Sequence, residues 1–122
     1  MARLWILIAG TAGFLSVAVG AFGAHAMQGD ARASALLATA SHYGLVHALA
    51  LLALAAIETR NGPAPPLAVA GWCFAGGIVL FSGTLVALAL SGLRLVGAVT
   101  PFGGALFLAG WAALAWYAFR LR

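Results

Sequence analysis

The chain has 122 residues, of which 65% are apolar and only eight are charged: six arginines, one aspartate and one glutamate. A soluble domain normally contains about 25% charged residues, whereas the fraction here is 7%. The chain therefore cannot cover itself with polar surface, and water is excluded as its main solvent. Because one helix needs about 20 apolar residues to cross a bilayer, the roughly 79 apolar residues correspond to about four crossings and leave no room for a soluble domain.

The charged residues divide the chain into four uncharged windows, at 4–29, 33–57, 61–93 and 95–119. Each window is long enough for one membrane-spanning helix and too short for two. We therefore predict one membrane domain over residues 1–122 with an all-α fold. The expected architecture is an integral membrane four-helix bundle, with helices at about 4–26, 31–58, 66–91 and 100–120.

The arginines predict the orientation of this bundle. With four crossings, both termini and the 59–66 loop lie on one side, which carries four arginines against two on the other. Short loops rich in arginine stay in the cytoplasm, so we expect both termini on the cytoplasmic side. The net charge of +4 does not indicate a nucleic-acid partner, because isolated arginines at helix ends form no basic patch. The four arginines on the side of the termini are Arg3, Arg60, Arg120 and Arg122, and the two arginines on the opposite side are Arg32 and Arg94.

The first apolar segment has a second interpretation. Arg3, the apolar stretch after it and the small-x-small run of residues 24–26 (AHA) resemble a secretory signal peptide with its cleavage site. The apolar region of such a signal is typically about 7–15 residues long, whereas residues 4–24 form a longer stretch. We therefore expect a retained membrane helix.

Turn signals predict where the helices begin and end. Asp30 follows a glycine and is a candidate N-cap for the second helix. Residues 61–66 (NGPAPP) end that helix and start the third, because proline lacks an N–H donor and Asn-Gly favours a turn. Thr100 is the candidate N-cap of the fourth helix, with Pro101 at the first helical position.

Small residues recur at helical spacing and predict where helices touch. In the first helix they are three, four and three residues apart, which draws one continuous stripe. In lipid such stripes mark close contacts between helices. They can serve contacts within the bundle, or one stripe can face a partner or a second copy of the chain. The predicted contact residues are Gly13, Ser16, Gly20, Gly23, Gly76, Gly83, Gly103 and Gly110.

The two acidic residues fall at predicted helix ends rather than inside a span. Intramembrane ionisable groups usually mark ion pathways, so their absence disfavours a proton-coupled exporter with an embedded carboxylate. We expect Glu58 to cap the neighbouring loop or to pair weakly with Arg60 among the lipid headgroups.

Three histidines fall toward the side opposite the termini and form the clearest candidate site. His42 and His47 are about 140° apart around a helix, so they cannot easily bind one ion together, whereas Tyr43 and His47 share a face. Hydroxyl groups fall in the same half of the bundle. The candidate polar cluster is His25, Tyr43, His47, Ser82, Thr84 and Thr100.

This cluster can be functional, as a polar pocket that opens outward, or structural, with its groups hydrogen-bonded between helices. A haem or metal held by His25 and His47 would need both rings at one depth, and no Cys-x-x-Cys-His motif supports it. We expect no cofactor or metal. Cys73, the only cysteine, is expected to be a buried packing residue. No catalytic constellation appears, and we expect no enzymatic activity.

Four ordered segments resemble a known family. They are residues 20–26 (GAFGAHA), Tyr43 with 47–52 (HALALL), 77–85 (GIVLFSGTL), and 97–104 (GAVTPFGG) followed by Gly110-Trp111. Together they resemble the small bacterial inner-membrane proteins of domain-of-unknown-function family 423, which are similar to eukaryotic transmembrane protein 256. The resemblance implies a four-helix protein of the inner (plasma) membrane without an assigned activity.

The resemblance also ranks the candidate residues. His25, Tyr43, His47, Ser82 and Thr100 belong to the family motifs, whereas His42 lies outside them. The family pattern usually has glutamine after the tyrosine, where this chain has Gly44. The side-chain amide that the family would place near His47 is therefore missing here.

Three functions remain as hypotheses. The first is a non-enzymatic accessory, assembly or lipid-contacting bundle, which associates with itself or with another membrane protein. The alternative is a small transporter or channel component with an outward-facing polar vestibule at His25 and His47. The third is a redox subunit that holds haem. The lipid bilayer is a partner in each case.

Overall fold

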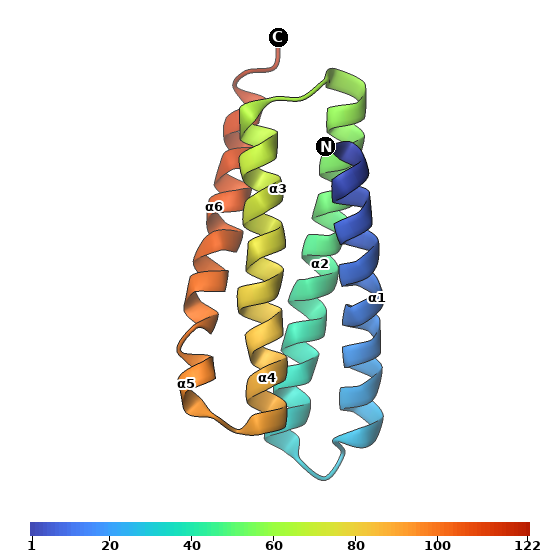
Figure 1. Ribbon diagram of the computed structural model, residues 1–122, viewed down its shortest axis with the longest axis vertical. Coiled ribbons are helices and arrows are strands. Elements are labelled where there is room, and N and C mark those ends of the chain that lie inside the picture. The colour runs from blue at the N-terminus through green and yellow to red at the C-terminus, as the bar shows by residue number, and fades with distance from the viewer.

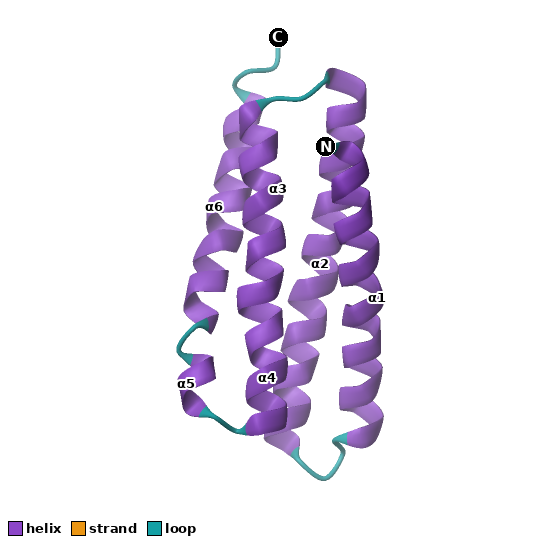
Figure 2. Ribbon diagram, viewed as in Figure 1, coloured by secondary structure: helices purple, strands orange, loops and turns teal.

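The computed structural model describes all residues, 1–122, and contains only helices and the loops that join them (Figure 2). The first two crossings are single helices, α1 (Ala2–Ala26) and α2 (Ala31–Asn61). The third consists of α3 (Pro65–Gly77), the π-helical segment η1 (Ile78–Gly83) and α4 (Thr84–Ser91). The fourth consists of the short α5 (Arg94–Gly97) and α6 (Thr100–Ala118). All four stretches are long and apolar enough to cross a membrane, which confirms the predicted four-span helical fold.

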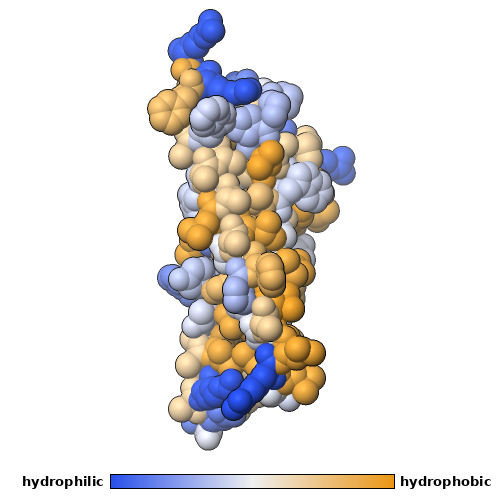
Figure 3. Space-filling view, turned by 90° about the vertical axis from the view of Figure 1, so that its left-hand side faces the viewer, coloured by the Kyte–Doolittle hydropathy of each residue, from blue (hydrophilic) through white to orange (hydrophobic).

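The four crossings run antiparallel to their chain neighbours, and both termini lie at the same end of the bundle (Figure 1). We call this the terminal end, which also holds the loop at 62–64, and we call the other the distal end, which holds the connections at 27–30 and 92–93. The side formed by α5 and α6 is largely apolar along its middle and hydrophilic at both ends (Figure 3). That distribution is typical of a membrane crossing.

Helix α2 lies at the centre of the bundle. In its most apolar stretch 44% of the residues are buried, against 22% or less in the other three crossings. α1 packs along α2 on one side, and the third crossing packs on another. α6 packs mainly against α3 and η1. Polar groups on α2 therefore have the best access to partners on every other crossing.

Pairs of facing residues set the relative height of the helices. The midpoints of α1 and α2 fall at residues 14 and 46. A Cβ added at Gly23 would lie 2.8 Å from the Leu37 Cβ, and one at Gly20 would lie 2.6 Å from the Ser41 Oγ. Since α1 and α2 are antiparallel, both contacts place the two midpoints at the same level. Residue 46 thus marks the middle of the membrane crossing.

Most of the predicted small-residue positions lie at close helix contacts. A Cβ at Gly103 would collide with the backbone of Leu80 and Phe81, so α6 approaches η1 too closely for any side chain there. Side chains of neighbouring helices also meet Gly20, Gly23, Gly76 and Gly110, and Ser16 is buried.

Two predicted positions and four unpredicted ones depart from that pattern. Gly13 faces open space, and Gly83 meets only a carbonyl oxygen of its own crossing at 3.9 Å. The small-residue stripes did not predict four further contacts: Gly44 faces Ser16, Gly71 faces Trp5, Gly77 faces Phe107 and Gly97 faces Leu88.

The third crossing contains a feature that the sequence did not indicate, a π-helical stretch over Ile78–Gly83. The wider turn breaks the regular hydrogen-bond ladder, and the Thr84 hydroxyl donates to the Leu80 carbonyl oxygen at 2.6 Å. π-Helical turns occur often at functional sites. Here the turn brings the Phe81 backbone against α6 and the Ser82 side chain against α2.

The helix starts are as predicted at Asp30 and different at Thr100. The Asp30 Oδ1 accepts a hydrogen bond from the Ala33 N–H at 3.0 Å, which confirms the N-cap. The prediction that Thr100 caps α6 is wrong: Val99 is the N-cap residue, and Thr100 is the first residue of the helix. Its hydroxyl is hydrogen-bonded to the Thr84 Oγ1 at 2.7 Å instead, because the distal end of α4 lies beside it.

Candidate functional site

His47 lies one residue from the midpoint of α2 and is 3% exposed. Its Nδ1 is 2.7 Å from the carbonyl oxygen of Tyr43, one turn earlier in α2. Its Nε2 is 3.0 Å from the indole Nε1 of Trp111, which comes from α6. The ring therefore joins the central helix to the fourth crossing in the middle of the bundle.

These two hydrogen bonds define the protonation of the ring. An indole N–H can only donate, so the His47 Nε2 accepts from Trp111 and carries no proton. A neutral imidazole has one N–H, which is then on Nδ1 and donates to the Tyr43 carbonyl. His47 is thus a neutral ring with both nitrogens in use. It can take up a proton or a metal ion at Nε2 only by breaking its bond to Trp111.

Aromatic rings surround His47. Its ring stacks on that of Phe107, with centroids 3.6 Å apart and planes 7° apart. The Tyr43 ring is within 14° of parallel to both, and the Phe81 ring lies 4.7 Å from that of Tyr43. Stacked and tilted pairs of this kind add to the stability that ring burial gives. We call the set the aromatic cluster: Tyr43, His47, Phe74, Phe81, Phe107 and Trp111.

A groove of about 590 Å³ opens beside this cluster, between α2 and α6. Tyr43, Leu108 and Trp111 line it and are 42%, 75% and 44% exposed. Because these residues are close to the middle of the crossing, the exposed surface faces lipid rather than water. We call this hollow the aromatic groove; its lining residues are Tyr43, His47, Phe81, Pro101, Gly104, Ala105, Phe107, Leu108 and Trp111.

The structure separates the three histidines. His25 is exposed at the distal end of α1, level with about residue 35 of α2. At 1.5 Å per residue it lies about 18 Å along the axis from His47. His42 is exposed on α2, and its ring lies nearly perpendicular to that of Tyr43, with centroids 5.5 Å apart. His25 and His47 therefore do not form a joint ligand set.

The serine and threonine hydroxyl groups of the candidate cluster bond to groups on neighbouring helices. Ser82 donates to the Ala40 carbonyl oxygen at 2.8 Å, and Thr84 is bonded to Thr100 at 2.7 Å. Of the six candidate residues, the structure brings together Tyr43 with His47 and Thr84 with Thr100. Ser82 binds α2 on its own.

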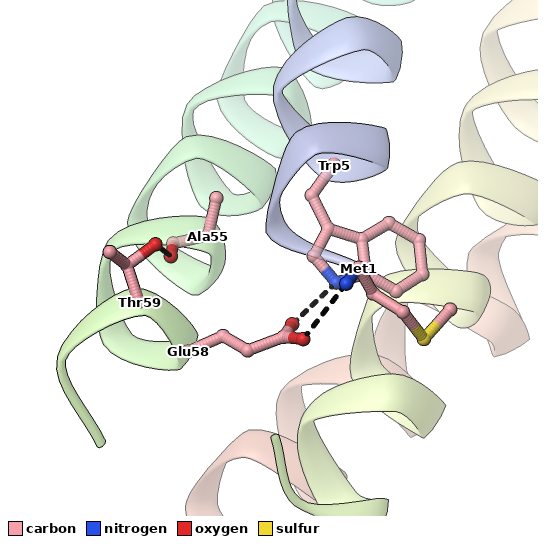
Figure 4. Close-up of polar contacts among 5 residues, drawn as sticks. All are labelled: Met1, Trp5, Ala55, Glu58 and Thr59. Atoms are coloured by element: carbon pink, nitrogen blue, oxygen red, sulfur yellow. Dashed lines mark hydrogen bonds and ion pairs between the residues drawn. The ribbon is translucent and has the colours of Figure 1, made fainter. Parts of the chain in front are cut away.

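Glu58 has surroundings that sequence reasoning did not find. Its side chain is 7% exposed, and its Oε2 accepts a hydrogen bond from the Trp5 Nε1 at 3.0 Å (Figure 4). Its Oε1 lies 3.4 Å from the amino terminus of Met1. The expectation that Glu58 caps the loop or pairs with Arg60 is wrong. α2 continues to Asn61, so the carboxylate is still on a helix face that packs against α1.

A signal for this burial was present in the spacing. Gly44, His47, Leu51, Leu54 and Glu58 follow one another at three or four residues, and all five are buried. Such a stripe marks one face of a helix. Following it to its end would have placed Glu58 on the inner face of α2.

Comparisons with known proteins identify relatives along the whole chain. The family described as "Protein of unknown function (DUF423)" matches residues 19–104. A UPF0382 membrane protein from Haemophilus influenzae is 36% identical, and the alignment covers 100% of this chain and 98% of the relative. The UPF0382 inner membrane protein YgdD from Escherichia coli K12 is 41% identical, with 98% and 92% covered.

A relative from a third organism is also similar. The UPF0382 membrane protein YwdK from Bacillus subtilis is 34% identical over 89% of this chain and 90% of its own length. No solved structure matches the chain. Together with the four apolar crossings, the relatives confirm the predicted membrane location, and the E. coli relative is named for the inner membrane.

Proposed function

The chain belongs to the DUF423 family of membrane proteins, which has no assigned activity, and from this premise we propose that it is a non-enzymatic accessory or assembly component that contacts lipid in the inner membrane. In this role the bundle presents its surface to lipid and to a partner. It holds no cofactor and carries out no reaction of its own. We further propose that both termini lie in the cytoplasm, since four of the six arginines are at the terminal end.

One observation carries the proposal: the polar groups inside the bundle are used in contacts between helices. No buried side-chain nitrogen or oxygen atom lacks a hydrogen-bond partner. His47 is bonded to α6, Ser82 to α2, and Glu58 to α1. An ion or solute pathway needs polar groups that are free to bind what passes, whereas these groups bind one another.

Association with a second copy or another membrane protein is supported by the outer face of α1. A Cβ added at Gly10 or Gly13 would meet nothing within 4 Å, so neither glycine serves a contact inside the bundle. A shallow hollow beside them includes Thr11 and Phe14, and Phe14 is 76% exposed. Small outward-facing residues allow the backbone of another helix to approach closely.

The transporter alternative has less support. It requires a polar vestibule shared by His25 and His47, and these residues lie about 18 Å apart along the bundle. It predicts solute or proton flux in reconstituted vesicles that His47→Ala abolishes. Our proposal expects no flux across a broad solute panel.

The proposal is tested by purification in a mild detergent, followed by mass measurement of the intact particle. We expect particles larger than one protein chain, containing a second copy, a co-purifying membrane protein or retained lipid. Gly13→Leu, which adds bulk to the outer face of α1, should reduce protein association, whereas Gly29→Leu in the distal connection should not. A lone monomer without lipid would contradict the proposal.

A further inference from the structure

We propose that the aromatic groove binds a lipid-soluble quinone, which is a planar ring with carbonyl oxygens and an isoprenoid tail, and that the Tyr43 hydroxyl donates a hydrogen bond to one of those oxygens. This inference rests on the proposed lipid-contacting function and names the ligand class for it. It is a binding site only, and no electron transfer to the protein is part of it.

The walls of the groove suit a flat apolar ring. Five of its nine lining residues carry aromatic rings, and they come from three separate elements, α2, η1 and α6. The rings of Tyr43, His47 and Phe107 are nearly parallel, so they present one common orientation to a ligand. Offset stacking on such rings is favourable for another planar ring. A volume of about 590 Å³ admits a substituted ring and the first part of a tail.

The Tyr43 hydroxyl supplies the argument for a polar acceptor on the ligand. Tyr43 lies three residues from the midpoint of α2, or about 4.5 Å along the axis, whereas the hydrocarbon layer extends about 15 Å on each side. The side chain is too short to reach the headgroups from there. Its hydroxyl makes no hydrogen bond within the chain, although every other polar partner of the cluster is bonded. A hydroxyl left without a partner in hydrocarbon is unfavourable.

Depth then decides the kind of acceptor. The ester carbonyls of phospholipids lie near the headgroups, and the acyl tails that fill the middle of the bilayer carry no acceptor. A quinone is uncharged and apolar enough to reach the middle of the bilayer, and its ring carries carbonyl oxygens. It therefore satisfies both the phenol and the aromatic walls.

A neighbouring protein helix fits the groove less well. Leu108 and Trp111 line the groove from α6 and are 75% and 44% exposed, so bulky side chains lie at its lipid-facing surface beside the small residue Gly104. Close helix contacts in lipid need small residues at the surface. The outer face of α1, on another side of the bundle, offers such residues instead.

The test uses the full chain in lipid nanodiscs and a benzoquinone with a ten-carbon alkyl tail as the probe. Quinones quench tryptophan fluorescence, and Trp111 lines the groove. We expect a saturable component of quenching above the linear quenching that free quinone in the bilayer causes. Tyr43→Phe, which removes only the hydroxyl, should weaken binding about fivefold. The matched control Tyr117→Phe, near the terminal end, should leave the affinity unchanged.

A second pair of variants keeps the test independent of the hydroxyl. A Cβ at Gly104 meets only the rim of the Phe81 ring at 3.8 Å, so the position tolerates a side chain, and Gly104→Leu fills the groove. It should abolish saturable quenching, whereas Gly13→Leu, which faces open space on α1, should not. Both variants are checked for monodispersity and helical content before binding is measured.

The outcomes separate this inference from the proposed function. Linear quenching only, or equal affinities for wild type, Tyr43→Phe and Gly104→Leu, would overturn the quinone site. If particles in mild detergent still contain lipid or a partner, the accessory function stands without it. Protection of the groove by a second copy, with no quinone binding, would also overturn the inference.

Discussion

Two indole N–H groups bind to α2, at two depths of the membrane. Trp5 of α1 donates to the Glu58 carboxylate near the terminal end, and Trp111 of α6 donates to the His47 ring near the middle. Both bonds are 3.0 Å long, and both acceptors lie on the same buried stripe of α2. The two acceptors are 11 residues apart, or about 16 Å along the helix.

The acceptors differ in charge, and depth explains why. Near the terminal end the carboxylate is paired with an ammonium group at 3.4 Å. In the middle of the bilayer a charge is costly, and the acceptor there is a neutral imidazole whose second nitrogen is also bonded. An indole N–H thus joins neighbouring crossings at both depths. Of the two acceptors, the ionised one lies at the depth that headgroups and water can reach. The following substitutions test that difference.

The largest effect is expected from placing a charge at the middle position. His47→Lys should lower the free energy of unfolding in detergent micelles by about 3 kcal/mol, because a lysine at the centre of a membrane helix costs about that much. The matched variant His47→Asn is neutral and should lose less, since an amide can still accept from Trp111. Equal losses for the two variants would show that depth does not restrict charge here.

The second effect concerns the charged acceptor. Trp5→Phe leaves the nearly buried Glu58 carboxylate without its indole donor and should cost about 2 kcal/mol, as hydrogen bonds to charged groups do. Trp72 is the control, because its ring packs edge-on against Trp5 and its indole makes no hydrogen bond. Trp72→Phe should cost less than about 0.5 kcal/mol.

The coupling between Trp5 and Glu58 separates the hydrogen bond from the packing of the ring. In a double-mutant cycle with Glu58→Leu, the loss caused by Trp5→Phe should shrink, because no carboxylate is left to need the donor. Unfolding by denaturant is the measurement. Additive losses would mean that Trp5 acts only through its burial, which is complete.

The sequence predicted the fold well because the fold follows from composition and charge position. Eight charges in a chain that is 65% apolar leave four membrane-sized windows, and Asp30 caps the second helix as its side-chain chemistry requires. The π-helical turn at Ile78–Gly83 was not predictable in this way. It lies where Gly103 comes close to Phe81, a contact between residues 22 positions apart in the chain.

The site was predicted only in part, for a related reason. Helical spacing correctly put Tyr43 and His47 on one face, since that is a local property of α2. The partners of His47 were not foreseen: Trp111 comes from α6, 64 residues away, and Phe107 from the same helix. The sequence groups His25 with His47 because both fall toward the same side of the membrane. The helices are long enough to keep these two residues apart along the bundle.

The third prediction returns to the neutral pair in the middle. Trp111→Phe leaves the His47 Nε2 without a donor and should cost about 1 kcal/mol, within the range measured for hydrogen bonds between membrane helices. Trp116→Phe is the control, because Trp116 is 61% exposed and its indole makes no hydrogen bond; its ring lies beside that of Phe119. Thermal unfolding in one detergent compares the two. A loss from Trp111→Phe that matches the control would mean that the bond contributes nothing to stability.

The smallest effect is expected where water competes. At the terminal end the Asn61 Nδ2 donates to the Tyr117 hydroxyl at 3.3 Å, which links α2 to α6 by a long bond between neutral groups. Tyr117→Phe should cost no more than about 0.5 kcal/mol, because water can replace the lost partner of Asn61. Water cannot do this at His47, which is buried in the hydrocarbon layer. If Tyr117→Phe proved as costly as Trp111→Phe, water access would not explain the different losses expected for these two substitutions. The contrast between Glu58 and His47 would then rest on charge alone.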